Sequence, residues 1–146
     1  MIGVLEILQY PDRRLTTPSR PVRFDELREV NELAMHMRAA MKAKGGIGIA
    51  ANQVGSPLRV CIVRGLTMIN PELTYESEAR QSALEGCLSV YKSAKRYQRL
   101  ASVRVTVTFL DVKGKSHVKS MYEIDARCVQ HELRHLSGLL INEGHE

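Results

Sequence analysis

The sequence lacks several features that would place it in a specialised class of protein. It has no tryptophan, only 5% aromatic residues and three cysteines. An odd cysteine count without an export signal argues against a disulfide framework. No apolar run approaches the roughly 18 residues that a membrane-spanning helix needs, and the N-terminus carries Glu6, lacks a basic leader and soon meets Pro11. We therefore expect no membrane partner, no secretion signal and a cytoplasmic location.

The composition is typical of one globular domain. The chain has 146 residues, of which 44% are hydrophobic and 25% charged, so it is long enough to bury a core. No internal repeat or low-complexity segment interrupts it. These features exclude a disordered tail, a collagen-like repeat and a coiled coil, and they predict a single domain over residues 1–146.

The charge is moderately positive, with 21 Lys and Arg against 16 Asp and Glu. Such a balance permits nucleic-acid contact without requiring it, and we expect no DNA partner. One stretch is basic without an acid among its charged members, which are Lys92, Lys95, Arg96, Arg99 and Arg104. It is either a solvated loop and strand face or a patch for an RNA-rich partner or an acidic ligand.

Hydrophobic periodicity predicts two helices. The first begins after Asp25, a plausible N-cap, carries apolar residues at helical spacing, and ends near Ala43 before Gly45-Gly46. The second covers Ile124 to about Leu136, with Gly138 just beyond its end.

Strands are expected between the helices. Extended segments are predicted at 58–63 and 67–69, and the clearest alternation of apolar and polar residues runs from Val103 to Phe109. Lys113-Gly114 resembles a hairpin turn into a partner strand at 116–121. Together these elements predict an α+β fold with mostly antiparallel sheets around the second helix, and an N-terminal helix.

The strongest chemical signal is His131-Glu132-Leu133-Arg134-His135 in the second helix. Two histidines four residues apart lie on one helical face, so both imidazoles can reach one metal ion, and Glu132 is close enough to act on a water there. An ordinary amphipathic helix, with His135 in the core and Glu132 solvated, is the alternative for this string alone.

The position of the histidines on the helix favours a metal. Ile124, Cys128, His131 and His135 follow one another at spacings of 4, 3 and 4, so they share one face, which the apolar residues predict to point inward. Histidines directed into a core are costly unless each finds a partner. The other three, His36, His117 and His145, have no such arrangement, and structural or surface roles are expected for them.

A third ligand must come from elsewhere in the chain. Cys87 is the best candidate, in Glu85-Gly86-Cys87-Leu88-Ser89, where glycine allows close backbone approach; a buried thiol is the alternative. Cys128 lies on the histidine helix itself, where a further ligand would crowd one face. Cys61 stands in an apolar strand and is expected in the core.

A glycine-rich segment, residues 45–53, is the third feature. It lacks the lysine and hydroxyl residue of a phosphate-binding loop and follows a helix, whereas a dinucleotide fingerprint follows a strand, so nucleotide binding is rejected. Gln53 at its end is an uncharged donor that could stabilise an oxyanion or make an ordinary loop hydrogen bond.

Three motifs in this order and spacing resemble those of the peptide deformylases: residues 46–53 (GIGIAANQ), 85–89 (EGCLS) and 130–135 (QHELRH). The resemblance extends to residues 10–15 and 69–73 and covers nearly the whole chain. It implies removal of the N-formyl group from the initiator methionine of nascent polypeptides, in a bacterial cytoplasm or in a host's if the protein is encoded by a phage.

The resemblance also implies roles for individual residues. Cys87, His131 and His135 would bind one divalent metal ion, with Fe(II) the usual native metal and Ni, Co or Zn as substitutes. Water on the metal would attack the formyl carbon while Glu132 takes its proton and passes it to the departing amine. The Gln53 amide and the Leu88 backbone N–H would stabilise the oxyanion. Ile47, Ile124 and Cys128 would form the methionine slot, with Gly48 leaving room for the peptide.

The sequence departs from the family pattern in three places. Arg134 stands where the family usually has Asp, which changes the support of the ligands and leaves the ligands themselves intact; Arg99, if near, would repel it. Tyr91 replaces a common proline. Only 11 residues follow His135, too few for the further long helix of many bacterial members. The chain is therefore expected to resemble the short deformylases of phages, with the stretch containing Lys92, Lys95, Arg96 and Arg99 as a possible ribosome contact.

Two other functions compete with this interpretation. A different HExxH metallohydrolase, such as a small peptidase, would leave Cys87 and the Gln53 segment unexplained. A non-catalytic module that keeps the fold would have no need for the complete set of reactive residues. Metal content separates the module from the enzymes, and cleavage of formyl-Met peptides separates a deformylase from a peptidase.

Overall fold

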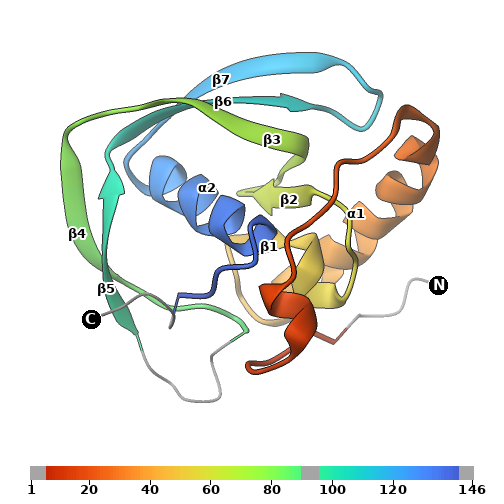
Figure 1. The fold of residues 1–146 in the computed structure, drawn as a ribbon, viewed down its shortest axis with the longest axis horizontal. Helices are drawn as coiled ribbons and strands as arrows, with labels where there is room; N and C mark the ends of the chain where they lie inside the picture. The colour runs from red at the N-terminus through yellow and green to blue at the C-terminus, as the bar shows by residue number, and fades with distance from the viewer. Residues whose placement is uncertain (1–5, 90–95, 142–146) are drawn as a thin grey trace.

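The protein, described here by a computed structural model over residues 6–89 and 96–141, has an α+β fold as expected. Strands surround α2 (Glu123–Leu136), and α1 (Leu27–Ala43) packs to one side (Figure 1). Three short 3-10 helices, Arg13–Thr16, Phe24–Glu26 and Ala51–Val54, connect the regular elements. Within the described ranges, no helix is long and apolar enough to cross a membrane.

Two antiparallel sheets frame α2. The larger has the order β1-β2-β3-β6-β7, and the smaller contains β4 and β5, which pair only with each other. The chain passes from β3 into β4 and from β5 into β6, so the two sheets form one curved wall around α2 (Figure 1). The strands are β1 (Gly48–Ala50), β2 (Val60–Val63), β3 (Leu66–Glu76), β4 (Arg80–Glu85), β5 (Tyr97–Ser102), β6 (Arg104–Leu110) and β7 (Ser116–Tyr122).

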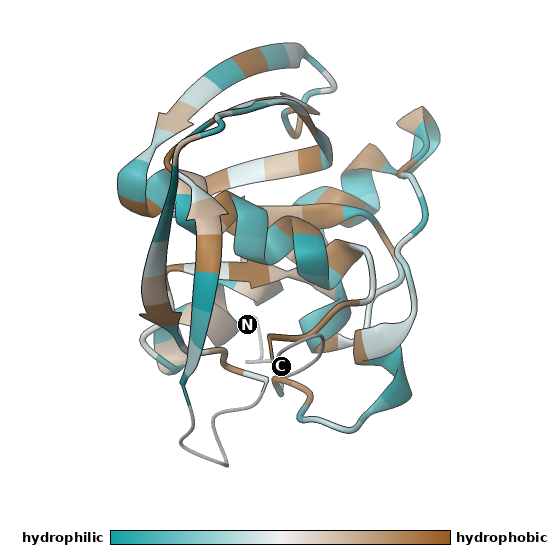
Figure 2. Cartoon of the chain, turned by 60° about the vertical axis from the view of Figure 1, so that its left-hand side comes forward, coloured by the Kyte–Doolittle hydropathy of each residue, from teal (hydrophilic) through white to brown (hydrophobic). Residues whose placement is uncertain are grey.

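Apolar side chains form two main clusters on opposite faces of the larger sheet. One joins α1 to the sheet through Val30, Met37 and Ile62, among others. The other fills the space between the sheet and α2 and includes Val107 and Val129. Hydrophobic and hydrophilic residues alternate along the strands and around α2 (Figure 2). This alternation allows the larger sheet to bury apolar side chains on both of its faces, and it turns one face of α2 toward the sheet.

The start of α1 differs from the prediction. The helix has the expected bounds, but Asp25 is not its N-cap, because a 3-10 turn precedes the helix and leaves Asp25 exposed. Glu26 is the buried acid here: its carboxylate accepts hydrogen bonds from the Arg23 backbone N–H at 2.9 Å and from the Arg20 guanidinium at 2.9 and 2.7 Å. The proline-containing segment before the helix and the Arg20–Glu26 ion pair therefore determine where the helix begins.

The pKa of Glu26 is lowered from 4.5 to about 2 by its hydrogen bonds to Arg20 and to the Arg23 backbone. The charged carboxylate therefore stabilises the fold fully above pH 4.5, and that contribution is lost as the pH falls toward 2. We expect Glu26→Gln to lower the free energy of unfolding at pH 7, with a difference from wild type that shrinks below pH 4.5. Urea denaturation across this pH range measures it, with exposed Glu29→Gln as the control; a difference independent of pH would contradict the prediction.

The predicted strands are confirmed in part. The segment 58–63 pairs from Val60, while Leu58 forms only an isolated bridge to Arg20. The segment 67–69 belongs to β3, which continues past Asn70 and Pro71 because the ladder with β6 shifts register there. Asn70 adopts a φ of 52°, and its side chain bonds the backbone of Val22 at 2.8 and 3.0 Å. The β6–β7 hairpin and α2 agree closely with expectation, whereas β1, β4 and β5 were not predicted.

Candidate active site

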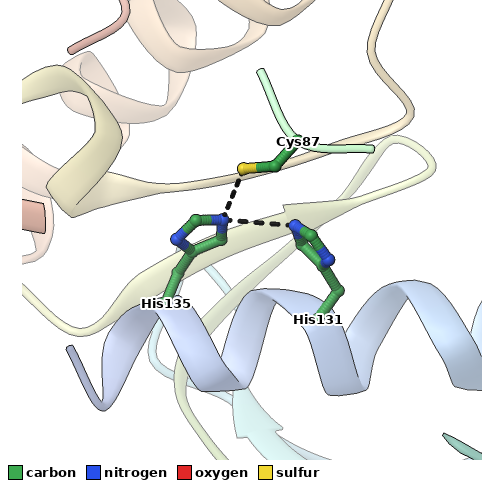
Figure 3. A group of neighbouring side chains, drawn as sticks. All are labelled: Cys87, His131 and His135. Carbon is green, nitrogen blue, oxygen red and sulfur yellow. Dashed lines mark hydrogen bonds between the residues drawn. The ribbon is translucent and has the colours of Figure 1, made fainter. Parts of the chain in front are cut away.

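Two histidines of α2 and one cysteine from another segment converge (Figure 3). The Nε2 atom of His135 lies 3.2 Å from Nε2 of His131 and 3.1 Å from Sγ of Cys87. The three side chains meet because residues four apart stack on one helical face, while the loop after β4 carries Cys87 across that face. The sequence-predicted ligand set is thus brought together.

The geometry of these three atoms fits a metal ion. All three donor atoms lie within 4.8 Å of one another. Neighbouring ligands of a tetrahedral ion with ordinary metal–sulfur and metal–nitrogen bonds are separated by about 3.3–3.6 Å, close to what the site shows. A thiolate with two imidazoles suits Fe(II), Ni, Co and Zn alike. The chemistry and the closeness of the donor set therefore fit a divalent transition metal.

Glu85 orients the ring of His131 by a contact with Nδ1, the ring nitrogen that does not face His135. Its carboxylate lies 3.0 Å from Nδ1 of His131, binds the guanidinium of Arg127, and lies 3.8 Å from Nε of Arg99. Burial would raise the pKa of Glu85, but His131 and the arginines outweigh it and lower the pKa overall. A carboxylate on the far nitrogen of a ligating histidine fixes the ring with Nε2 toward the metal. This role was not predicted; the only signal was the position of Glu85 two residues before Cys87.

Proton affinity differs sharply between the two histidines. Burial lowers the pKa of His131, but hydrogen bonding to Cys87 and Glu85 raises it well above its usual range. Burial and the neighbouring His131 lower the pKa of His135. A metal ion binds only the deprotonated ligands, so its binding would displace the proton from His131.

Glu132 is the buried carboxylate of the site. It is 4% exposed, its Oε1 has no hydrogen-bond partner among the residues that the structure describes, and burial raises its pKa to about 7. A buried carboxylate oxygen without a partner is unusual, because the loss of hydration is not offset by a bond. It lines the same cavity as His131 and Cys87, so it can receive a proton from a molecule bound there.

Two neutral hydrogen-bond donors flank Cys87. Gln53 is fixed by its Oε1, which accepts from the Ala50 N–H at 2.9 Å, and its Nε2 donates to Ser89 Oγ at 3.0 Å and contacts Cys87 Sγ at 3.9 Å. The backbone N–H of Leu88 makes no hydrogen bond to another described residue. Both predicted donors therefore lie at the cavity, one held in position and one available to a ligand.

A cavity of about 670 Å³ opens above these groups. Ile47, Gly48, Ile124 and Cys128 all line it, as predicted. The expected inward direction of Ile124 is wrong: it is 55% exposed, because it lies in the first turn of α2, before the first buried residue of the helix, Ala126. Ile47 is 49% exposed at the same cavity. The lining also includes residues that were not predicted, namely Lys44, Leu84, Arg96 and Arg127.

Arg134 does not line the cavity that Cys87, His131 and Glu132 share. It lines a different cavity together with Arg99, so the condition for the repulsion named above is met. Burial lowers the pKa of Arg99, and the charge of Arg134 adds to this effect. Among the residues that the structure describes, no acid forms an ion pair with Arg134. The charge of Arg134 also contributes to the lowered pKa of His135.

The members of the basic stretch that the structure describes have different surroundings. Arg96 is exposed beside the large cavity, Arg99 is directed toward Glu85, and Arg104 lies against the rings of Tyr75 and Tyr122. Arg99 was expected in a ribosome-binding patch, but only 13% of its side chain is exposed, because Glu85 draws the guanidinium inward. Tyr91, Lys92 and Lys95 lie outside the described residues.

The fold and the site together define a class. A Cys–His–His donor set, a buried carboxylate between the two histidines and an open cavity are the parts of a metal-dependent hydrolase. Residues 4–144 match the family described as Polypeptide deformylase. A peptide deformylase of Afipia carboxidovorans is 37% identical over 95% of this chain and 85% of its own length.

Solved structures agree with this relationship. The Met-Ala-Ser-bound class I type b peptide deformylase of Acinetobacter baumannii superposes with a TM-score of 0.92 at 33% identity, covering 97% of this chain and 99% of the other. A probable peptide deformylase of Synechococcus phage S-SSM7 gives 0.87 at 38% identity, covering 94% and 97%. The expected resemblance to phage members is confirmed.

This chain belongs to the polypeptide deformylase family. Its reaction is the hydrolytic removal of the N-formyl group from new polypeptides, and the family is metal-dependent.

Proposed function

We propose that deformylation takes place in the large cavity, with Cys87, His131 and His135 as metal ligands and Glu132 as the acid–base group. The observation that carries this proposal is the unpartnered, buried Oε1 of Glu132 beside three converging donor atoms. We further propose Fe(II) as the metal, with Ni, Co or Zn as substitutes. When bound, such an ion supplies Lewis acidity that makes a water nucleophilic at neutral pH.

Glu132 moves the proton. Its carboxylate takes a proton from the attacking water as the new C–O bond forms at the formyl carbon. It then delivers that proton to the methionine nitrogen as the C–N bond breaks, which releases formate and a free amine. Burial raises the pKa of Glu132 to about 7. This value suits both transfers, because a group that titrates near the working pH accepts and donates a proton with similar ease.

Gln53 and Leu88 support the negative charge of the tetrahedral intermediate. The Oε1–Ala50 hydrogen bond holds the Gln53 amide so that Nε2 faces Cys87. The Leu88 N–H, which has no partner within the described part of the chain, follows directly after Cys87. One hydrogen of Nε2 would exchange its weak sulfur contact for the oxyanion. Loss of one such donor typically lowers kcat by about 100–1,000-fold.

The substrate side chain occupies the apolar part of the cavity. We propose that Ile47, Ile124 and Cys128 contact the methionine and that Gly48 leaves space for the peptide backbone. The two isoleucines are half-exposed at this cavity and are therefore available to a ligand. A related deformylase binds Met-Ala-Ser, the product form of such a peptide. Formyl-Met nascent chains, in the cytoplasm, are the substrates that we propose for this domain, residues 1–146.

Formate release tests the proposed function. Protein loaded anaerobically with Fe(II), or with Ni(II), is incubated with formyl-Met-Ala-Ser and with its N-acetyl counterpart. We expect stoichiometric formate from the formyl peptide, no cleavage of the acetyl peptide and no cleavage of internal peptide bonds. Internal cleavage would favour a peptidase. Folded, metal-loaded protein that releases no formate would contradict the proposal, and failure to bind metal would favour a non-catalytic module.

Gly48 tests the position of Glu132. A methyl group at this residue would approach Oε2 of Glu132 to 2.6 Å and Sγ of Cys128 to 2.7 Å. We therefore expect Gly48→Ala to displace the carboxylate and lower kcat/KM at least about 10-fold, since small misplacements of reacting groups are costly. Steady-state deformylation measures the change.

Gly86→Ala is the matched control, because among the described residues its methyl group would meet only the Arg96 side chain, at 3.8 Å. Both variants should retain the metal and the circular dichroism of the wild type. Equal activity in the two alanine variants would show that the close approach at Gly48 does not position Glu132.

We also propose a transient ribosome contact through Lys92, Lys95 and Arg96, without the buried Arg99. The exposed position of Arg96 at the rim of the substrate cavity supports it. Charge reversal at Lys95 and Arg96 should weaken co-sedimentation with ribosomes, whereas reversal at exposed Arg28, on α1, should not. Unchanged sedimentation of the double variant would contradict the contact.

A further inference from the structure

Arg127, in the second turn of α2, uses both terminal nitrogens of its guanidinium within the protein. Its Nη1 donates to the Glu85 carboxylate and to the Arg99 carbonyl at 3.2 Å, and its Nη2 donates to the Gln81 carbonyl. The side chain is 17% exposed and lies at the wall of the large cavity. Because three acceptors of the chain occupy these nitrogens, the contacts indicate a role in holding the site together rather than in binding substrate.

The three acceptors belong to both strands of the smaller sheet. Gln81 and Glu85 lie on β4, and Arg99 lies on β5. These strands pair only with each other, so their backbone ladder does not fix them against α2. A single side chain of α2 that donates to both strands therefore attaches the smaller sheet to the helix that carries the two histidines.

Gln130 makes a second attachment between the same elements. It follows Arg127 by three residues, so both side chains lie on one face of α2. Its Oε1 accepts from the Ser102 N–H at 3.1 Å, and its Nε2 donates to the Ser102 carbonyl and to the Ala126 carbonyl, each at 2.9 Å. Both side chains thus bond the smaller sheet, but of the two it is Arg127 that also bonds Glu85, the carboxylate on His131.

The two oxygens of Glu85 have different partners. Oε1 lies 3.0 Å from Nδ1 of His131, and Oε2 accepts from Arg127. Arg99 is the other arginine nearby, but its Nε comes only to 3.8 Å from Oε1, outside hydrogen-bond distance. A hydrogen bond between a guanidinium and a carboxylate is strong because both groups are charged. Arg127 therefore fixes the carboxylate by one oxygen and leaves the other directed at the imidazole.

We propose that Arg127 is a positioning residue of the metal site. Its guanidinium holds Glu85 and both strands of the smaller sheet, so that the carboxylate stays on Nδ1 of His131 and Nε2 of that ring stays directed toward His135. A group that fixes the far side of a ligating histidine supports both the affinity for the metal and the activity. This inference rests on the proposed function, in which His131 and His135 are metal ligands.

Arg127→Met tests the proposal, because methionine keeps the apolar stem of the side chain and removes the donors. We expect the affinity for Ni(II), measured by competition with a chelator, to fall by about 10–100-fold. In protein saturated with Ni(II), kcat for formyl-Met-Ala-Ser should fall by at least about threefold, with KM nearly unchanged. Arg127→Lys keeps the charge but cannot reach all three acceptors, so its affinity should lie between those of the wild type and Arg127→Met. If Arg127→Met does not fold, the lysine variant carries the comparison.

Gln130→Met is the matched control, because it removes the other attachment of the smaller sheet and leaves the bond to Glu85. It should speed amide hydrogen exchange on β5 and keep the affinity for Ni(II) within about threefold of the wild type. Equal losses of affinity in Gln130→Met and Arg127→Met would overturn the proposal. A raised KM in Arg127→Met with unchanged affinity would make Arg127 a substrate contact and overturn it as well. A wild type that binds Ni(II) but releases no formate would contradict the proposed function alone, because the comparison of affinities still decides the role of Arg127.

Discussion

Glu132→Gln is expected to lower kcat for formate release by about 100–10,000-fold, the range in which a positioned acid–base group contributes. Glutamine keeps the shape of the side chain but cannot hold the transferred proton. Glu132 is not among the proposed metal ligands, so the variant should still bind one ion per chain. Formate release under single-turnover conditions measures the chemical step directly.

The control for this experiment is Glu123→Gln on the same helix. Glu123 is exposed at the first turn of α2, so removal of its charge should leave kcat within about twofold of the wild type. If Glu132→Gln retains wild-type kcat with full metal content, another group carries the proton. The role assigned to the unpartnered Oε1 atom would then be wrong.

Cys87→Ser is expected to abolish stoichiometric retention of metal and, with it, activity. The hydroxyl of serine is a far weaker ligand than a thiolate for a transition metal. Even mutation of a residue that only hydrogen-bonds to a ligand typically lowers the affinity for the metal by about 10–100-fold. Metal analysis after dialysis should find well under one ion per chain. A cobalt-loaded wild type should show sulfur-to-metal charge-transfer absorption that Cys87→Ser lacks.

The other cysteines make this test specific. Cys61 is fully buried in β2, where burial raises the pKa of its thiol far above the usual range, so it is not poised to ligate. Cys61→Ala should therefore keep the metal and the absorption band, with only a loss of stability from the vacated space. Retention of metal by Cys87→Ser would contradict the ligand set.

The parts of the fold that follow from side-chain pattern could be predicted. The stripe beginning at Leu27 predicts α1, and the alternation from Val103 to Phe109 predicts the β6–β7 hairpin. The convergence of Cys87 with His131 and His135 was expected from the four-residue spacing of the histidines and from the motif around Cys87. In contrast, β4 and β5 are mainly exposed and pair only with each other, so no buried stripe marks them. Their presence depends on backbone pairing, which leaves little trace in composition.

The surroundings of the site could not be predicted for a related reason. Glu85 supports His131 only because β4 ends beside α2, and no local pattern places those two elements together. The position of Arg134 could be recognised as unusual, but the cavity that it shares with Arg99 depends on the curvature of the wall around α2. Contacts between segments distant in sequence require the folded arrangement itself.

The convergence of Cys87 with the α2 histidines has a further consequence for folding. An ion held by these side chains would act as a cross-link between Cys87 and His135, which are 48 positions apart in the sequence. As long as the cross-link persists, it closes a loop and so reduces the conformational entropy of the unfolded chain. In addition, an ion that binds only the folded state stabilises that state by mass action. The metal would thus tie the smaller sheet to the helix behind the reactive carboxylate. Removal of the ion by a chelator would loosen first the loop that carries Cys87, while the larger sheet and its two apolar clusters retain their packing.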